Sequence, residues 1–371
     1  MVDKKPILIT QPDLPSLDKV IPYLEKIWDN KWLTNNGAFH EELESKLAKF
    51  LNVPYISLFG NGTLALITAI QCLELEGEVI TTPYSFVATT HSLWWNNIKP
   101  VFVDIDSEFG NIDTSKIEAA ITKKTTAILA VHVYGNPCNT SEIERIAKKH
   151  NLKVIYDAAH AFGVEENGGS ILNHGDLSIL SFHATKVFNT FEGGAIVSHS
   201  LETKKKIDLL KNFGIQDENT IISAGINAKM NEFQAAIGLL QLEEHNKRIN
   251  KRKLVFEYYL KKLKGINGIK VVKPTKHLLS NYAYFPILVD QNVSSINRDT
   301  LYSRLKENNI LARKYFYPLI SNIDLYNSLE SSSFENLPIA NRFSSQVICL
   351  PIFPDLTFKE IEKITDIIKS K

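Results

Sequence analysis

A single lysine, Lys186, stands where the sequence could support covalent chemistry. It lies in Ser181-Phe-His-Ala-Thr-Lys186-Val-Phe-Asn-Thr-Phe-Glu192-Gly-Gly194, between the apolar runs 177–182 and 195–197. Both runs predict buried strands. Burial disfavours the ammonium form, so the pKa of such a lysine falls and its free amine can attack a carbonyl carbon. The alternative is a lysine on a surface loop without a chemical role.

Asp157 and His160 could supply the partners that such a lysine needs. They follow the apolar run Lys153-Val-Ile-Tyr in the stretch Asp157-Ala-Ala-His160. A lysine that forms a Schiff base, together with an aspartate that pairs with a pyridinium nitrogen, is the minimum set for a pyridoxal phosphate enzyme. Asp157 could instead cap a following helix, and His160 could be a core histidine.

The stretch Gly60-Asn61-Gly62-Thr63-Leu64-Ala65 follows a predicted strand and opens a predicted helix. Free N–H groups at a helix N-terminus suit a phosphate. The same residues match a dinucleotide-binding pattern, so an NAD(P)-dependent nucleotide-sugar oxidoreductase is the alternative. That fold needs an acidic residue at the end of the next strand, whereas Glu78 begins its predicted strand. The pattern therefore favours a single phosphate.

The overall composition argues against several classes of partner. The 371 residues carry 42 lysines and arginines against 41 aspartates and glutamates, so no net field draws the chain to nucleic acid or to a membrane. Cys72, Cys138 and Cys349 have neither metal-ligand spacing nor a disulfide pattern, which is typical of a reducing cytosol. No signal peptide or membrane-spanning run is present in the sequence. We therefore expect a cytoplasmic protein without a metal site.

From residue 55 onward, apolar runs of strand length alternate with helical segments. This alternation predicts an α/β domain with a doubly wound, mostly parallel sheet and with ligands at the carboxyl ends of its strands. Within it we expect helices over residues 115–121 and 142–150, the second entered through the capping pattern Ser141-x-x-Glu144. A long helical segment, 231–263, leads to a smaller α+β domain. A solvated helix face is predicted for its basic residues Lys247, Arg248, Lys251, Arg252 and Lys253.

Together these stretches resemble the DegT/DnrJ/EryC1/StrS family of nucleotide-sugar aminotransferases over nearly the whole chain. The resemblance rests on motifs in one order: Trp32-Leu-Thr34, Asn61-Gly-Thr63, Tyr84-Ser-Phe86-Val-Ala-Thr89, Pro100-Val-Phe-Val-Asp104, His132-Val-Tyr-Gly135, Asp157-Ala-Ala-His160, Ser181-Phe-His-Ala-Thr-Lys186, Glu192-Gly-Gly194 and Gly225-Ile-Asn227-Ala-Lys-Met230-Asn-Glu232. It implies aspartate aminotransferase fold type I. The large pyridoxal phosphate-binding domain, residues 1–250, would surround a mostly parallel seven-stranded sheet, and residues 251–371 would form the small C-terminal α+β domain.

The resemblance also implies roles for the residues of a cofactor site. Lys186 would form the Schiff base with pyridoxal phosphate, Asp157 would hold the pyridine nitrogen, and His160 would meet the ring hydroxyl. Phe86 would stack on the ring, with ordinary core packing as the alternative. Phosphate contacts would come from Gly62, Thr63 and Ser181. In a homodimer with shared active sites, Asn227 would reach the phosphate bound by the neighbouring subunit, although Asn227 could instead cap the helix that follows.

The substrates follow from the same resemblance. L-Glutamate would donate the amino group through pyridoxamine phosphate. The acceptor would be a dTDP-linked keto-6-deoxyhexose, aminated at C4 or C3 with C4 favoured, for surface polysaccharide or glycoconjugate biosynthesis. A UDP-N-acetyl-ketosugar is the alternative acceptor. Thr34, Lys229 and Tyr317 are candidate substrate ligands, but relatives often carry arginine at the position of Lys229, and lysine cannot make the same bidentate contact with a carboxylate or phosphate.

Overall fold

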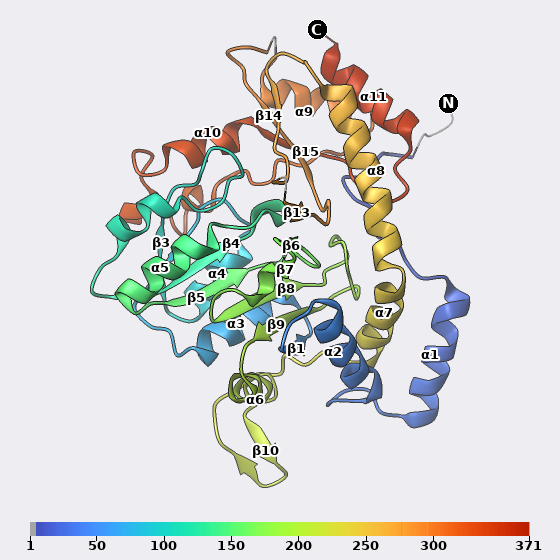
Figure 1. The fold of residues 1–371 in the computed structure, drawn as a ribbon, viewed down its shortest axis with the longest axis vertical. Coiled ribbons are helices and arrows are strands. Elements are labelled where there is room, and N and C mark those ends of the chain that lie inside the picture. Colours follow the sequence, from blue (N-terminus) through green and yellow to red (C-terminus); the bar gives the residue numbers. More distant parts are fainter. Residues whose placement is uncertain (1–4, 276, 295, 371) are drawn as a thin grey trace.

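A seven-stranded sheet forms the centre of the computed structural model, which describes residues 5–275, 277–294 and 296–370 (Figure 1). Its strands occur in the order β1-β9-β8-β5-β4-β2-β3. β8, β5, β4, β2 and β3 are mutually parallel, and β9 runs antiparallel to both of its neighbours. The strands are β1 (Tyr55–Phe59), β9 (Gly194–Ser198), β8 (Leu177–Ser181), β5 (Lys153–Asp157), β4 (Thr125–Val131), β2 (Glu78–Thr81) and β3 (Lys99–Phe102). The mostly parallel sheet expected from the sequence is confirmed.

Helices cover both faces of this sheet, because alternate residues of its strands are apolar on both sides. In β5, Val154 and Tyr156 pack in the same apolar layer as Ile143 of α5 (Thr140–His150). Ile155 faces the other way and packs in the layer of α3 (Gly62–Cys72). Side chains alternate across a strand, so the central strands are buried on both faces. Polar groups at the strand ends are therefore the ones that a ligand can reach.

Further elements surround the sheet in the first two thirds of the chain. α1 (Leu17–Asn30) packs on α7 (Glu232–Glu243), and α2 (Ala38–Phe50) packs on both α7 and β1. α4 (Ala88–Trp95) lies beside β3, and α6 (Leu201–Leu210) lies beside β1 and β9. The hairpin of β10 (Ile215–Asp217) and β11 (Thr220–Ile221) projects from the large sheet (Figure 1).

The last third of the chain has an apolar core of its own. The antiparallel strands β12 (Ile269–Val271), β14 (Phe285–Val289) and β15 (Val347–Leu350) form a three-stranded sheet. α8 (His245–Leu263), α9 (Arg298–Glu307) and α11 (Phe358–Lys369) bury Phe256, Leu301 and Ile361 against it. α10 (Pro338–Gln346) precedes β15 directly, and β13 (Leu278–Leu279) pairs with β6 (Glu165–Glu166), which pairs with β7 (Gly169–Ser170).

Four local predictions are wrong. Residues 115–121 form two 3-10 turns, Thr114–Lys116 and Glu118–Ala120, because Asp113 Oδ1 accepts the Ser115 N–H and starts a tight turn. α5 begins earlier than expected, since Asn139 Oδ1 accepts the Glu142 N–H and acts as the cap in place of Ser141.

The third and fourth corrections concern the segment 231–263. It is two helices, because Glu244 leaves the helical conformation at φ −99° and ψ 1°. The expected solvated basic face also fails at two positions, since Arg248 and Arg252 are buried. Arg248 Nε donates to Asp13 Oδ2 at 2.8 Å, and Arg252 donates to the Ile352 carbonyl at 3.1 Å. α8 runs through residue 250 without a break, and the domain boundary near that residue stays a prediction.

Candidate active site

The turn between β8 and β9 carries Lys186 at the carboxyl end of β8. Ser181 of β8 pairs with Gly194 of β9, and the twelve residues 182–193 connect the two strands. The Lys186 N–H donates to the His183 carbonyl at 2.8 Å. Phe188, two residues later, is buried and stacks on Phe162 with ring centroids 4.4 Å apart. The turn is thus anchored in the core on one side of the lysine.

Burial increases the share of Lys186 that is present as the neutral, nucleophilic amine. Burial lowers the pKa of Lys186 to about 8, and the negative charge of Asp157 opposes this shift. Within the described residues, Lys186 Nζ forms no hydrogen bond and no ion pair. At pH 7 about one amine in ten is therefore neutral, a far larger fraction than for a lysine with the ordinary pKa near 10.4.

We expect the reactivity of Lys186 to titrate well below that of ordinary lysines. Cofactor-free protein would be treated with a small aldehyde and a mild hydride reductant across a pH series, and the labelled peptides quantified by mass spectrometry. Because only the neutral amine attacks a carbonyl, labelling of Lys186 should rise along a curve with its midpoint near the lowered pKa of about 8. A midpoint indistinguishable from that of exposed lysines in the same digest would contradict this assignment.

Asp157 ends β5 as a buried carboxylate that forms no ion pair with any of the described residues, although the charge of Lys186 reaches it. Its Oδ2 accepts a hydrogen bond from Thr89 Oγ1 at 2.7 Å, and its Oδ1 accepts the Ala159 N–H at 3.1 Å. Burial raises the pKa of Asp157, while these two hydrogen bonds and Lys186 oppose the rise. Residues 158–164 form turns, so the alternative role of Asp157 as a helix cap is wrong. Such a carboxylate would be stabilised by a cationic ligand.

His160 presents a single nitrogen to a ligand. Its Nδ1 accepts the Tyr134 N–H at 3.2 Å. Burial, together with the charge of Lys186, lowers the pKa of His160 well below its ordinary value. The ring is therefore neutral, and Nε2 carries its proton. His160 also stacks parallel to Phe316, with ring centroids 5.8 Å apart, so the Nε2–H donor has a fixed direction.

The start of α3 lies directly against β8 and β9. A Cβ added at Gly62 would stand 3.0 Å from the Ser181 Cβ, and one added at Gly194 would stand 2.7 Å from the Asn61 carbonyl carbon. Asn61 Oδ1 accepts the Leu64 N–H at 2.9 Å, while the first N–H groups of a helix have no partner within it. These N–H groups, beside the Ser181 hydroxyl, form an anion-binding site, which we call the α3 cradle.

The dinucleotide alternative fails at Glu78. This residue is buried at the amino end of β2, opposite the carboxyl end where a ribose would have to lie. Its carboxylate accepts hydrogen bonds from Lys99 Nζ at 3.0 Å and from Thr122 Oγ1 at 2.6 Å. Glu78 therefore has no free oxygen directed at a ligand site.

Lys186, Asp157, His160 and the start of α3 share one cavity of about 590 Å³. Seven of the predicted site residues line it: Gly62, Thr63, Phe86, Asp157, His160, Ser181 and Lys186. Sequence reasoning missed eight lining side chains with polar or aromatic groups: Asn61, Ser85, His183, Thr185, Glu192, Tyr284, Tyr315 and Phe316. Asn61 and Ser85 belong to motifs that the family resemblance quoted, and His183, Thr185 and Glu192 flank Lys186. The other three come from the last third of the chain, where no local pattern pointed to the site.

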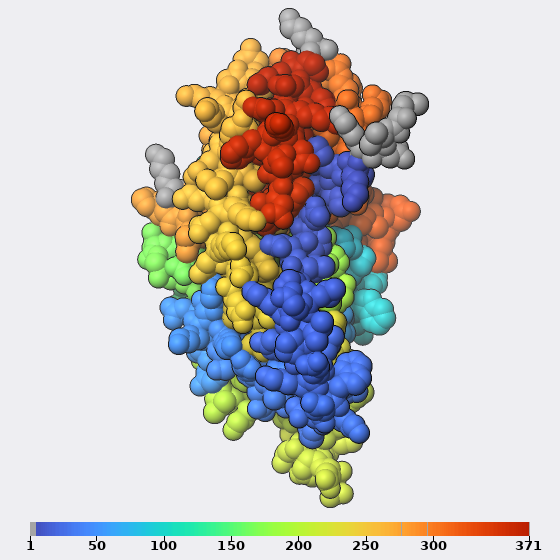
Figure 2. Space-filling view, turned by 90° about the vertical axis from the view of Figure 1, so that its right-hand side faces the viewer, coloured from blue at the N-terminus to red at the C-terminus, as the bar shows by residue number. Residues whose placement is uncertain are grey.

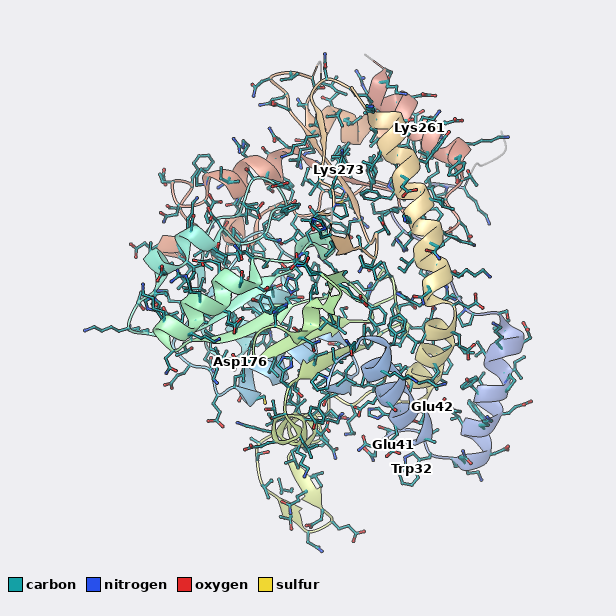
Figure 3. All side chains as sticks on the ribbon, viewed as in Figure 1. Trp32, Glu41, Glu42, Asp176, Lys261 and Lys273 are labelled. Carbon is teal, nitrogen blue, oxygen red and sulfur yellow. The ribbon has the colours of Figure 1, made fainter. Side chains whose placement is uncertain are left out.

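Four predicted residues do not line this cavity. Thr34 is exposed in the loop between α1 and α2, next to Trp32, which points outward at the edge of the molecule (Figure 3). Lys229 Nζ donates to Asn227 Oδ1 at 2.9 Å. Tyr317 stacks under the Arg298 guanidinium, which lies 4.5 Å from the ring centroid. The roles of these four residues stay predictions.

The cap of α7 is also settled by the geometry. Asn231 Oδ1 accepts the Gln234 N–H at 2.9 Å, and Gln234 Oε1 accepts the Asn231 N–H at 3.2 Å. The alternative role of Asn227 as this cap is therefore wrong.

Among the residues that the structure describes, there is no group of three or more histidine, cysteine, aspartate or glutamate side chains that could hold a metal ion. No helix in that part of the chain has both the length and the apolar character to cross a membrane.

Comparison with known proteins identifies the family of this chain. The dTDP-4-amino-4,6-dideoxy-D-glucose transaminase of Shigella dysenteriae is 56% identical over 366 residues, which cover 99% of each chain. The enzyme of the same name from Escherichia coli is 54% identical over 371 residues, covering 100% of each chain. The crystal structure of DesI in the presence of its TDP-sugar product has a TM-score of 0.94 at 31% identity, covering 99% of this chain and 93% of that one. The predicted family and fold type are thus confirmed: residues 17–369 match the DegT/DnrJ/EryC1/StrS aminotransferase family, and the chain belongs to it.

Proposed function

We propose that this aminotransferase uses pyridoxal phosphate bound in the cavity around Lys186. One observation carries the proposal: an amine with a lowered pKa and a buried carboxylate that forms no ion pair among the described residues line the same cavity. The donor set matches the groups of that molecule, since the α3 cradle suits a phosphate, Asp157 suits a pyridinium and His160 Nε2–H suits a phenolate oxygen. When bound, the cofactor would carry the amino group between substrates and withdraw electrons from the carbon that loses its proton.

The residues of the chain would then divide the work. Lys186 Nζ would hold the cofactor aldehyde carbon covalently and, once the amino donor displaces it, accept the proton from the donor Cα. Asp157 would hold the protonated ring nitrogen, and Phe86 would cover one face of the ring. Gly62, Thr63 and Ser181 would bind the phosphate. In the second half of a ping-pong cycle, Lys186 would return a proton to the carbon of the aminated acceptor.

For the substrates, we infer L-glutamate as donor and dTDP-4-keto-6-deoxy-D-glucose as acceptor, aminated at C4. The acceptor is inferred from the names of the two relatives at 54–56% identity, and the donor from the family resemblance. Relatives with other nucleotides are more distant: a GDP-perosamine synthase of Vibrio cholerae is 32% identical, and a UDP-4-amino-4,6-dideoxy-N-acetyl-beta-L-altrosamine transaminase of Campylobacter jejuni is 28% identical. We propose a cytoplasmic step in surface polysaccharide or glycoconjugate synthesis, consistent with the free cysteines Cys72, Cys138 and Cys349.

A substrate panel tests this assignment. The purified protein would be incubated with pyridoxal phosphate, L-glutamate and either the 4-keto or the 3-keto isomer of the dTDP sugar, with a UDP-N-acetyl-ketosugar in parallel. We expect 2-oxoglutarate and a C4-aminated dTDP sugar, identified by mass spectrometry and NMR. Amination of the UDP sugar alone would overturn the acceptor assignment, and amination at C3 alone would overturn the ring position.

We further propose a homodimer with shared active sites. Asn227 and Lys229 lie outside the cavity of their own chain. They are near exposed apolar side chains, because Phe213 is 47% exposed and lies under Lys229 Nζ, and Ile226 is 38% exposed. Phe86, which lines the cavity, is itself 60% exposed. A neighbouring subunit that covers these side chains would bring Asn227 to the phosphate of the partner's site.

Heterodimer complementation tests the shared site. Lys186→Ala and Asn227→Ala protomers would be co-expressed with different tags and the mixed dimer purified. If Asn227 serves the neighbouring site, each mixed dimer contains one site with both residues intact and recovers about half of the wild-type activity per dimer. If Asn227 serves its own chain, each site lacks one residue, and the mixed dimer shows at most about half of the activity of the Asn227→Ala parent.

A further inference from the structure

The buried hydroxyl groups of Thr89 and Ser85 form a hydrogen-bonded series that ends on Asp157. The proposed function gives these two groups no role. Thr89 lies in the first turn of α4, and its side chain is fully buried. Its Oγ1 is 2.7 Å from Asp157 Oδ2 and 2.8 Å from the Ser85 Oγ. Ser85 is also buried and lines the cavity. The turn that presents the Phe86 ring to the cavity therefore also delivers two hydroxyls to the carboxylate.

The hydrogen bonds of this group have a fixed direction. An ionised carboxylate only accepts, and a threonine hydroxyl has one proton to give. Thr89 therefore donates to Asp157 Oδ2, and Ser85 must donate to Thr89. Because the Ala159 N–H holds Oδ1, each carboxylate oxygen is fixed by one protein donor. Successive hydrogen bonds of this kind polarise one another.

The hydrogen bond from Thr89 opposes the effect of burial on the charge of Asp157. Burial favours the neutral acid, and it raises the pKa of Asp157, whereas the hydrogen bond from Thr89 is the largest of the opposing effects. A protonated carboxyl group could not hold a pyridinium. The adjacent Thr90 shows that burial in this helix does not itself demand such a partner, since its hydroxyl is fully buried and has no hydrogen-bond partner among the described residues.

We propose that Ser85 and Thr89 form a hydroxyl relay that keeps Asp157 ionised and aimed into the cavity, with Thr89 as a positioning residue. The proposal rests on the assignment of pyridoxal phosphate to this site. It makes a specific demand on Thr89, because the hydroxyl group is required and the methyl group is not. It makes a weaker demand on Ser85, which acts only through Thr89.

Three variants separate the relay from ordinary packing. Thr89→Val keeps the shape of the side chain and removes the hydroxyl, Thr89→Ser keeps the hydroxyl, and Thr90→Val removes a buried hydroxyl that makes no hydrogen bond. We expect Thr89→Val to bind pyridoxal phosphate about 10- to 100-fold more weakly, the range for a lost hydrogen bond to a charged group. Thr89→Ser should stay within about threefold of the wild type, and Thr90→Val should match it.

A pH measurement supplies the readout that packing would not move. The absorbance and affinity of the bound cofactor would be followed as the pH falls, and thermal unfolding of each cofactor-free variant would check the fold. In Thr89→Val, Asp157 loses a donor, so its protonation and the loss of cofactor should begin at higher pH than in the wild type. If Thr89→Val and Thr90→Val lose the cofactor over the same pH range as the pH falls (the acid limb of the binding curve), the relay is overturned.

Two further outcomes keep the test decisive. If Thr89→Val does not fold, Ser85→Ala carries the test, since it removes the donor to Thr89 and should shift the acid limb in the same direction by a smaller amount. An unshifted limb in Ser85→Ala would then overturn the relay. Failure of the wild-type protein to bind pyridoxal phosphate at all would overturn the proposed function and, with it, the relay that rests on it.

Discussion

Replacement of Lys186 by alanine should abolish turnover, with a loss of at least about 10³-fold, because one side chain supplies both the covalent attachment and the base. Among the described residues that line the cavity, Lys186 is the one lysine. The variant should still fold and bind pyridoxal phosphate through the α3 cradle and Asp157, but without the absorbance band of the covalently bound form. Turnover would be measured with L-glutamate and the dTDP-4-keto sugar.

The matched control is Lys205→Ala. Lys205 is exposed on α6 and does not line the cavity, so its loss should leave both the spectrum and the turnover unchanged. A small primary amine added to Lys186→Ala should restore a fraction of the activity, since it can occupy the vacated space and accept the proton. Turnover of Lys186→Ala within tenfold of the wild type would rule out the assigned roles.

Asp157→Asn should show the second largest effect, a fall in turnover of about 10²-fold or more, because an amide supplies no negative charge to the ring nitrogen. Affinity for pyridoxal phosphate should fall as well. The stability of the cofactor-free protein should change in the opposite sense. Burial raises the pKa of Asp157, so between its ordinary and its raised value the folded state binds more protons than the unfolded state, and stability falls as pH rises.

At pH 7.5 the wild-type protein must bury an ionised carboxylate at position 157, which lowers its free energy of unfolding, whereas the asparagine variant buries a neutral amide. The thermal unfolding temperature of the cofactor-free variant should therefore equal or exceed that of the wild type. Asp176 provides the contrast at the opposite end of β8 (Figure 3). Its Oδ2 accepts the Val154 N–H at 2.8 Å, and its Oδ1 contacts Lys153 Nζ at 3.3 Å. Asp176→Asn should lower the unfolding temperature and leave cofactor affinity unchanged. A large loss of stability in Asp157→Asn would contradict the assignment of Asp157 as a ligand group.

The sheet and most of the cofactor side of the cavity could be predicted from the sequence, because both depend on local patterns. Apolar runs identify the strands, and polar residues that end parallel strands must meet at one edge. Asp157 and Ser181 could therefore be assigned to one site before their distance was known. The break at Glu244 could not be predicted, since no glycine or proline marks it and its carboxylate instead contacts Lys19 of α1 at 3.3 Å.

The far wall of the cavity escaped prediction for another reason. Tyr284, Tyr315 and Phe316 reach the site only through packing of the last third of the chain against the first. Tyr315, for instance, accepts hydrogen bonds at its carbonyl from the hydroxyls of Tyr84 and Tyr134. No spacing in the sequence records a contact over such a separation. The relay behind Asp157 was likewise hidden, because a motif gives residue types and not the distance between two oxygens.

The N-terminal residues add a second connection between the two main apolar cores. Residues 5–16 and α8 run side by side between these cores (Figure 2). The Ile7 N–H donates to the Asn309 carbonyl at 2.9 Å, and Asp13 Oδ2 accepts from Arg248 Nε at 2.8 Å, before α1 begins. The first and last thirds of the chain also share the apolar cluster that contains Tyr84 and Phe316, and β13 pairs with β6. The wall that carries Tyr284 is therefore held against the Lys186 side of the cavity by contacts at several separate points.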